Sequence, residues 1–242
     1  GFDTGGGLRL QRKSDTLMAD IRPRANFRRF VVGNNLDADE YGVSSSAKYT
    51  QERYSAGLDF TYSRDSTLST ESTDTGQVNS VTDRDTVSIS PSLVYSISDR
   101  LSLQSSFMYN SVSYLDALTT GFIDYEYLQG SLGLSYFLND KFRLFSNFVV
   151  SDFATGDTAS STRSYSDQLG VAWQINESLD VLGSIGWNQS FIDFLEQKLA
   201  LIPTPVPHVV VESTPASAES GGLIANVSVT KRYDRAYAKL DY

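Results

Sequence analysis

The segment from Leu128 to Phe148 determines the interpretation of this chain. It reads Leu-Gln-Gly-Ser-Leu-Gly-Leu-Ser-Tyr-Phe-Leu, then Asn139-Asp140-Lys141, then Phe-Arg-Leu-Phe-Ser-Asn-Phe. Two runs that alternate apolar with small or polar side chains are therefore joined by a very short polar turn. Because successive side chains of a β-strand point to opposite faces, each run has one apolar and one polar face. The segment predicts a β-hairpin.

The same hairpin pattern recurs roughly every 40 residues along the chain. Asn, Asp and Ser favour short turns because their side chains bond the local backbone. The expected short turns are Lys13-Ser14-Asp15, Gln51-Glu52-Arg53, Ser98-Asp99-Arg100, Asn139-Asp140-Lys141, Asn176-Glu177-Ser178 and Tyr233-Asp234. Long connections, mostly rich in Ser, Thr, Asp and Gly, are expected at residues 31–39, 64–84, 112–124, 153–164 and 189–221.

This regular exchange of short turns and long connections is typical of transmembrane β-barrels, which have short periplasmic turns and longer extracellular loops. We predict an all-β, antiparallel, up-and-down transmembrane β-barrel with about twelve strands, in a single domain that covers residues 1–242. A soluble β-sandwich is the alternative, since it also uses alternating runs. It gives no reason, however, for the asymmetry between the two ends of the hairpins.

The composition narrows the class of protein further. No window holds 18 or more consecutive apolar residues, so no membrane-spanning helix is expected, whereas a barrel strand needs only about 9–11 residues. The 242 residues include no cysteine, which excludes disulfides, thiolate catalysis and cysteine-based metal sites. The formal net charge of −9 argues against general nucleic-acid binding, which requires a basic surface.

Aromatic residues are plentiful, with 14 Tyr and 13 Phe. Amphipathic rings favour the level of the lipid headgroups, where outer-membrane barrels carry aromatic girdles. We expect such girdles because many tyrosines lie near the ends of the alternating runs, although tyrosine is also simply a good strand residue. The tyrosines concerned are Tyr41, Tyr49, Tyr54, Tyr62, Tyr95, Tyr109, Tyr125, Tyr136 and Tyr165.

Two features disturb the regular pattern. Pro23 and Pro91 lie inside runs, where a proline removes a ladder hydrogen bond and normally marks an edge or a bulge. The last run ends at Tyr242, too early to span a membrane comfortably, so we expect the chain to be part of a longer barrel. The alternative is a barrel that ends here, since Ala236, Ala238, Leu240 and Tyr242 share a face and end in an aromatic residue, as in the C-terminal assembly signal of outer-membrane proteins.

Charged residues gather on the predicted lumen face of the N-terminal strands and the last hairpin. Stripes of Arg and Lys bias pores towards anions, whereas arginines paired with lumen acids only brace the wall. We favour the second interpretation slightly, and a register shift of one residue would turn all these side chains outward. The stripe consists of Arg9, Asp20, Arg22, Arg24, Arg28, Lys48, Asp59, Arg232, Arg235 and Lys239.

Little in the sequence indicates catalysis or a bound cofactor. His208 is the single histidine and lies in a proline-rich segment without an identifiable partner, which is a poor basis for a zinc site or a catalytic serine. The run Asp37-Ala38-Asp39-Glu40 offers oxygen ligands that suit Ca²⁺, but it lacks the EF-hand pattern, and a solvated acidic loop explains it better. We predict no enzymatic activity, no cofactor and no metal site.

With the hairpins laid out, the chain resembles the Gram-negative outer-membrane β-barrel proteins. More narrowly, Arg-Arg-Phe-Val-Val-Gly-Asn-Asn-Leu-Asp-Ala-Asp-Glu-Tyr at 28–41 and Tyr-Ser-Arg-Asp-Ser-Thr-Leu at 62–68 resemble a poorly characterised proteobacterial outer-membrane β-barrel group. The resemblance implies the fold and a location in the outer membrane. It also implies further hairpins beyond this chain, and it carries no catalytic residues.

The function that we expect is a channel-like or porin-like role in the passage of small polar solutes, or a conduit of an envelope export system. The alternative is a non-conducting structural or interaction barrel that anchors extracellular loops or docks an envelope protein. Expected partners are outer-membrane lipids and an envelope protein that binds the connection at 189–221, which mixes apolar residues with prolines. The expected location is the outer membrane of a Gram-negative bacterium.

Overall fold

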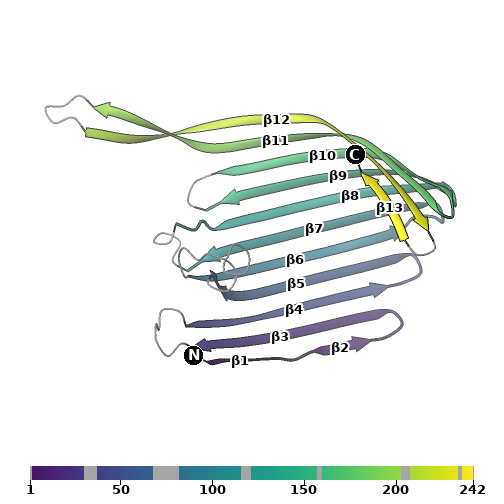
Figure 1. Ribbon diagram of the computed structural model, residues 1–242, viewed down its shortest axis with the longest axis horizontal. Helices are drawn as coiled ribbons and strands as arrows, with labels where there is room; N and C mark the ends of the chain where they lie inside the picture. The colour runs from purple at the N-terminus through teal and green to yellow at the C-terminus, as the bar shows by residue number, and fades with distance from the viewer. Residues whose placement is uncertain are drawn as a thin grey trace.

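The computed structural model describes residues 2–29, 37–67, 82–115, 121–156, 160–202, 208–233 and 236–241, with side chains omitted at 197–202, 208–212, 232–233, 236–239 and 241. The described chain forms one sheet (Figure 1). Its strands are β1 (Phe2–Gly7), β2 (Leu10–Lys13), β3 (Leu17–Arg29), β4 (Ala38–Thr50), β5 (Tyr54–Ser66), β6 (Asp83–Ser96), β7 (Leu101–Tyr114), β8 (Tyr125–Asn139), β9 (Phe142–Thr155), β10 (Ser161–Asn176), β11 (Leu179–Ile202), β12 (His208–Tyr233) and β13 (Ala236–Asp241). No helix in these ranges is long and apolar enough to cross a membrane.

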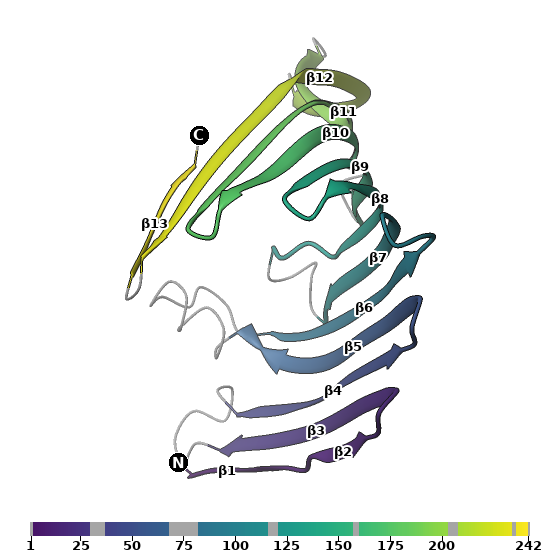
Figure 2. The same cartoon turned by 90° about the vertical axis from the view of Figure 1, so that its right-hand side faces the viewer.

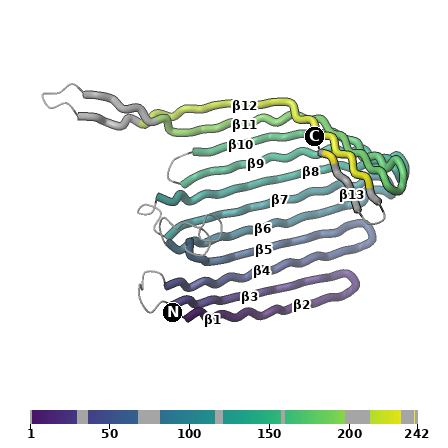
Figure 3. The backbone as a smooth tube through the Cα atoms, in the orientation of Figure 1, coloured from purple at the N-terminus to yellow at the C-terminus, as the bar shows by residue number. Residues whose placement is uncertain are grey.

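The strands follow one another across the sheet in chain order, each antiparallel to the next (Figure 3). β1 and β2 both pair with β3 and fill one strand position, so the sheet has the twelve positions predicted. Figure 2 shows the sheet curved into an open arc, and within the described residues its edges, β1–β2 and β13, each have one neighbour. This single curved layer confirms the up-and-down barrel fold. The soluble sandwich is wrong, because the described residues form one sheet and none of them forms a second sheet that faces it.

The short turns lie at one end of the sheet and the long connections at the other (Figure 1). Polar side chains close the turns as expected: the Asn139 Oδ1 atom accepts a hydrogen bond from the Lys141 amide at 2.9 Å, and the Asn176 Oδ1 atom accepts one from Ser178 at the same distance. The strands run further into the long connections than expected. At 64–84, for example, β5 continues to Ser66 and β6 begins at Asp83, while residues 68–81 lie outside the description.

The predicted long loop at 189–221 is wrong, because β11 and β12 remain paired through it up to Ile202 and His208. The pairing with β10 ends at Ser161 and Asp193, so nine further residue pairs of β11 and β12 project beyond the rest of the sheet. Prolines and apolar residues suggested an irregular segment. Pro203, Pro205 and Pro207 lie outside the described residues. Pro215 is accepted within β12 because this part of the strand has one partner strand, and proline is tolerated on such edges. His208 is therefore the first residue of a strand rather than part of a loop.

Both internal prolines interrupt one of their two ladders, as expected of a residue without an N–H. Pro91 pairs with Leu58 of β5, but on its other side the β6–β7 ladder is broken between Ile89 and Ser92. Pro23 pairs with Val43 of β4, and the opposite strand is divided there into β1 and β2. The register is nevertheless the same on both sides of the Pro91 gap, so the faces do not exchange.

Cross-strand partners share a face, and the register therefore divides the sheet into two faces. The outer face carries the apolar positions, and the tyrosines at the run ends form two rows on it: Tyr49, Tyr54, Tyr95 and Tyr136 with Trp173 near the turns, and Tyr41, Tyr62, Tyr109 and Tyr165 near the long connections. Along a strand the rows are eight residues apart, about 26 Å at about 3.3 Å per residue, close to the apolar band of barrels. Tyr125 is the exception, because its partner Val112 places it on the other face.

The sheet is a single layer, and almost no apolar side chain is buried in it. Ala38 and Val112 are the buried apolar residues of the described chain, whereas large apolar side chains such as Leu169 and Ile185 remain more than half exposed on the outer face. In water, an exposed apolar surface of this kind would promote aggregation. It suits a protein whose outer face contacts lipid.

Candidate functional site on the inner face

The inner face is polar and concave. Arg143, Gln174, Asp180 and Asn226 belong to four different strands, β9 to β12, yet they line one hollow. Side chains from four adjacent strands converge in this way only where the sheet curves around them. A second hollow of about 410 Å³ lies on the same face of the N-terminal half. The inner face is thus the side on which a complete barrel encloses its lumen.

In the middle strands the inner face consists largely of small hydroxyl side chains. The register pairs Ser88 and Ser92 of β6 with residues of the same face on both β5 and β7, and it pairs Ser90 with Asp59 of β5. Ser106 and Ser131 hydrogen-bond across β7 and β8 with 2.7 Å between their Oγ atoms. Short side chains of this kind leave the space in front of the sheet unfilled, and their hydroxyls are available to water.

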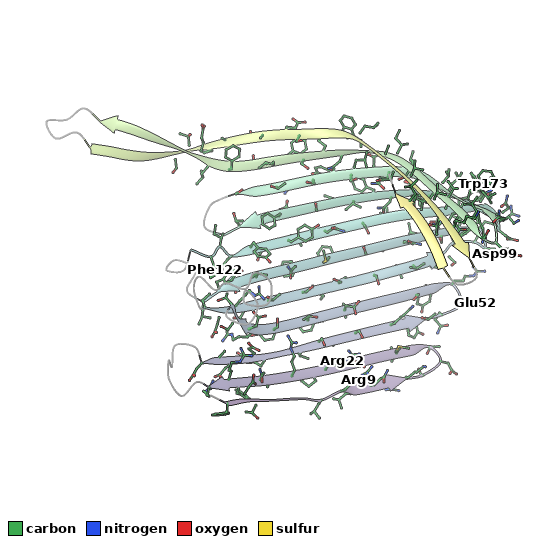
Figure 4. All side chains as sticks on the ribbon, viewed as in Figure 1. Arg9, Arg22, Glu52, Asp99, Phe122 and Trp173 are labelled. Atoms are coloured by element: carbon green, nitrogen blue, oxygen red, sulfur yellow. The ribbon has the colours of Figure 1, made fainter. Side chains whose placement is uncertain are left out.

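The N-terminal strands carry a charged cluster on the inner face. Arg9 and Arg22 both bind Asp20: the Arg9 Nε atom lies 2.6 Å from the Asp20 carboxylate, and Arg22 binds its second oxygen. Asp20 is buried while the two arginine side chains are about half exposed. Figure 4 shows Arg9 and Arg22 close together at this end of the sheet. The Asp20 carboxylate therefore fixes both arginine side chains on the inner face, and its single negative charge compensates one of their two positive charges.

The other predicted stripe residues have different surroundings. Arg28 pairs with Asp3 of β1 at 3.3 Å. Arg24, Lys48 and Asp59 share the inner face with Asp20, and none of them has an ion pair within the described residues. Lys48 and Asp59 line the hollow of about 410 Å³. Arg235 lies outside the description, as do the side chains of Arg232 and Lys239, whose backbones pair in β12 and β13.

Sequence reasoning missed one inner-face ion pair. Arg84 and Asp65 pair across β5 and β6, with 3.0 Å from the Arg84 Nε atom to one carboxylate oxygen. The signal was present, since Arg84 continues the row of Ser88, Ser90 and Ser92 with period two. It was overlooked because residues 64–84 read as a loop.

The outer face carries its own ion pairs at the end near the long connections. Arg64 binds Asp85, whose carboxylate also accepts a hydrogen bond from the Tyr62 hydroxyl at 3.0 Å. Arg163 and Asp152 form a similar pair at 2.7 Å. These pairs lie beyond the row of tyrosines near the long connections, where the headgroups of a membrane begin. Charged pairs are tolerated there because water and polar lipid groups reach them.

The acidic run Asp37-Ala38-Asp39-Glu40 is divided by the strand alternation. Asp39 lies on the outer face and binds Arg29, whereas Glu40 lies opposite Asn26 on the inner face. Ala38, which separates Asp37 from Asp39, is buried. Asp37 and Asp39 both pair with Arg29, and Glu40 faces the opposite side, so the run forms no cluster of three possible metal ligands within the described residues.

No family model and no curated protein matches the chain. Solved structures do. The chain is similar to Fiu, the ferric-catecholate import receptor of E. coli K12, with a TM-score of 0.68 at 9% identity over 99% of this chain and 52% of that one. It is similar to the copper transporter OprC, with a TM-score of 0.63 at 12% identity, covering 99% and 45%.

A loop-deletion form of OmpT, an outer membrane protein of Vibrio cholerae, has a TM-score of 0.52 at 11% identity over 76% of this chain and 57% of that one. These neighbours are Gram-negative outer-membrane β-barrels. The chain therefore has the outer-membrane β-barrel fold, and this fold supports the predicted location in the outer membrane. The chain spans about half the length of the structures that it matches.

Proposed function

We propose that this chain forms part of the wall of an outer-membrane barrel through which small polar solutes pass. The observation that carries the proposal is the inner face of the middle strands, where hydroxyl side chains such as Ser90, Ser106 and Ser131 leave the space in front of the sheet open. Barrels of about eight strands are filled by their own side chains, whereas those of 16 or more leave room inside. Twelve strand positions in an open arc favour the larger kind.

The structural neighbours add support from a second direction. Fiu is an import receptor and OprC a transporter, so two of the three neighbours move a solute across the membrane. The identity of about a tenth carries no substrate from them to this chain. The proposal is accordingly limited to small polar solutes and does not include ferric catecholates or copper.

The experiment that tests the proposal is conductance of the detergent-purified, full-length protein in a planar bilayer. Steady single-channel currents are expected, because water and ions fill a lumen lined by short polar side chains. A protein that is correctly folded in the bilayer but electrically silent, at either polarity of the applied voltage, would contradict passive passage.

The charged cluster leads to a prediction about ion selectivity. Asp20→Asn removes the acid that holds Arg9 and Arg22, so two cations face the lumen without a counter-charge. We expect the anion-to-cation permeability ratio to rise by about two- to fivefold, since a unit charge in water contributes about 1 kcal/mol at about 4 Å and salt screens it further away. The measurement is the reversal potential under a salt gradient.

Asp99→Asn is the matched control for this prediction. It removes the same charge from the exposed turn between β6 and β7, which Figure 4 shows at the turn end of the sheet and away from Arg9 and Arg22. Its permeability ratio should stay close to that of the unmodified protein. Equal shifts in both variants would mean that total charge, rather than the cluster on the wall, sets the selectivity.

A non-conducting interaction barrel is the second candidate, and one observation favours it. The β11–β12 hairpin projects nine residue pairs past β10, about 30 Å at about 3.3 Å per residue, on the side of the long connections (Figure 1). Exposed Phe194 and Leu195 lie at its base. A ribbon of this length is suited to docking an envelope protein. If deleting residues 194–216 removes a partner without changing conductance, both roles belong to one barrel.

A further inference from the structure

We propose that the inner face holds a binding site for small anions, centred on Arg143 near the short turns. The site is a hollow of about 890 Å³ lined by residues of β8 to β12 and the turn between β8 and β9. That volume lies within the range of pockets that bind small molecules, about 300–1,000 Å³. The site deepens the proposed passage of solutes by naming a class of solute, and it rests on that proposal only for how the solute arrives.

Arg143 is held between two aromatic rings. Its guanidinium carbon lies 5.9 Å from the centre of the Phe137 ring and 5.8 Å from that of Phe145. A cation over the face of an aromatic ring is attracted by the ring's negative face within about 6 Å. The two rings therefore restrict the orientation of the guanidinium group while leaving its N–H donors unused.

The cation has no charged partner. Within the described chain Arg143 has no ion pair and no side-chain hydrogen bond, whereas Arg9, Arg22, Arg28, Arg64 and Arg84 all bind carboxylates. Its side chain is half-buried. A partly desolvated guanidinium ion offers up to five donors in a planar fork, which matches the oxygens of a carboxylate or a phosphate.

Three strands build this arrangement. In the register, Phe137 of β8 lies beside Arg143, and the ladder shifts immediately afterwards, between Phe137 and Asn139. Such bulges re-aim neighbouring side chains. On the other side Arg143 pairs with Ala172 and Phe145 with Gly170, and a Cβ atom at Gly170 would collide with the Phe145 ring. Small residues of β10 thus make the space that the ring and the guanidinium group occupy.

Neutral polar side chains complete the lining. Gln174, Asn226, Ser228 and Thr230 face the same hollow, and each offers a hydrogen-bond donor. Asp140 and Asp180 also line it, and their charges oppose a ligand with several negative charges, whereas Lys141 adds a second cation to the lining. The chemistry therefore fits a small polar solute with a single carboxylate or phosphate group, which Arg143 would bind through two oxygens.

The test is phosphate binding to the full-length protein, solubilised in a detergent without phosphate groups. The binding is measured by isothermal titration calorimetry. We expect a dissociation constant at or below about 1 mM. Arg143→Gln should weaken binding by about tenfold or more, because a hydrogen bond to a charged group is lost. Arg143→Lys keeps the charge but loses the planar fork and should retain part of the affinity.

Arg100→Gln is the matched control, since it removes one positive charge from an exposed turn at the same end of the sheet. It should leave phosphate binding unchanged. Equal weakening in Arg143→Gln and Arg100→Gln, or unchanged binding in Arg143→Gln, would overturn the proposal, as would the absence of phosphate binding to the unmodified protein. Circular dichroism establishes that each variant retains its β-structure.

The open channel and the Arg143 anion site can be disproved independently of each other. Phosphate binding without bilayer conductance would keep the Arg143 site and remove the open channel. Conductance without phosphate binding would keep the channel and overturn the site. In a conducting barrel, phosphate added on one side should also reduce the single-channel current, and this reduction should disappear in Arg143→Gln.

Discussion

Replacing Leu169 by arginine is expected to lower the free energy of unfolding in lipid vesicles by about 2–4 kcal/mol, the cost of a cation at the middle of the lipid face of a barrel. Leu169 lies on the outer face of β10, halfway between Tyr165 and Trp173, and 60% of its surface is exposed. In a membrane that exposed surface contacts hydrocarbon. The measurement is denaturant-induced unfolding, followed by tryptophan fluorescence.

The neighbouring residue provides a matched control. Gln168 precedes Leu169 in β10 and therefore lies on the inner face. Gln168→Arg introduces the same charge into the same strand at the same depth, but on the side that faces water in the proposed barrel. Gln168 is half-buried, and the added side chain can extend into the lumen, so the effect on stability should stay within about 1 kcal/mol. Similar losses in both variants would mean that the two faces of β10 do not differ in their surroundings.

Gly186→Ala is expected to destabilise the barrel by about 1–3 kcal/mol, the usual cost of overpacking. A Cβ atom at Gly186 of β11 would collide with the backbone oxygen of Asp167 in β10 and lie 2.7 Å from the Gln168 side chain. Backbone atoms of a paired strand cannot move aside without breaking the ladder. The change should therefore appear as a lower unfolding midpoint.

Gly222→Ala is the control for this second prediction. Gly222 belongs to β12 and shares the inner face, but a Cβ atom there would meet nothing within 4 Å. Alanine should be neutral or slightly stabilising at this position, because it reduces the freedom of the unfolded chain. Equal destabilisation in Gly186→Ala and Gly222→Ala would contradict close strand approach at Gly186 as the cause.

The sequence by itself determined the strand count, the short turns and the face of most strand residues. The alternation of Leu128–Phe148 and the polar turn at Asn139 are local properties, and a side chain's face follows from parity once a strand is recognised. The prolines were similarly informative, since the missing N–H of Pro23 and Pro91 affects a ladder in any register. These features need no knowledge of which strands become neighbours.

Only the tertiary structure decided how far each ladder extends and which groups meet across it. β11 and β12 remain paired up to Ile202 and His208 because the described pairs of this segment contain one proline, Pro215, and the other residues supply the backbone groups that a ladder needs. Asp20 binds Arg9 because the register brings the preceding strand segment beside it, whereas its second partner, Arg22, is two residues away in β3. The Arg143 site depends on the registers of three strands and one bulge together. Such contacts join residues far apart in the chain, so no local pattern specifies them.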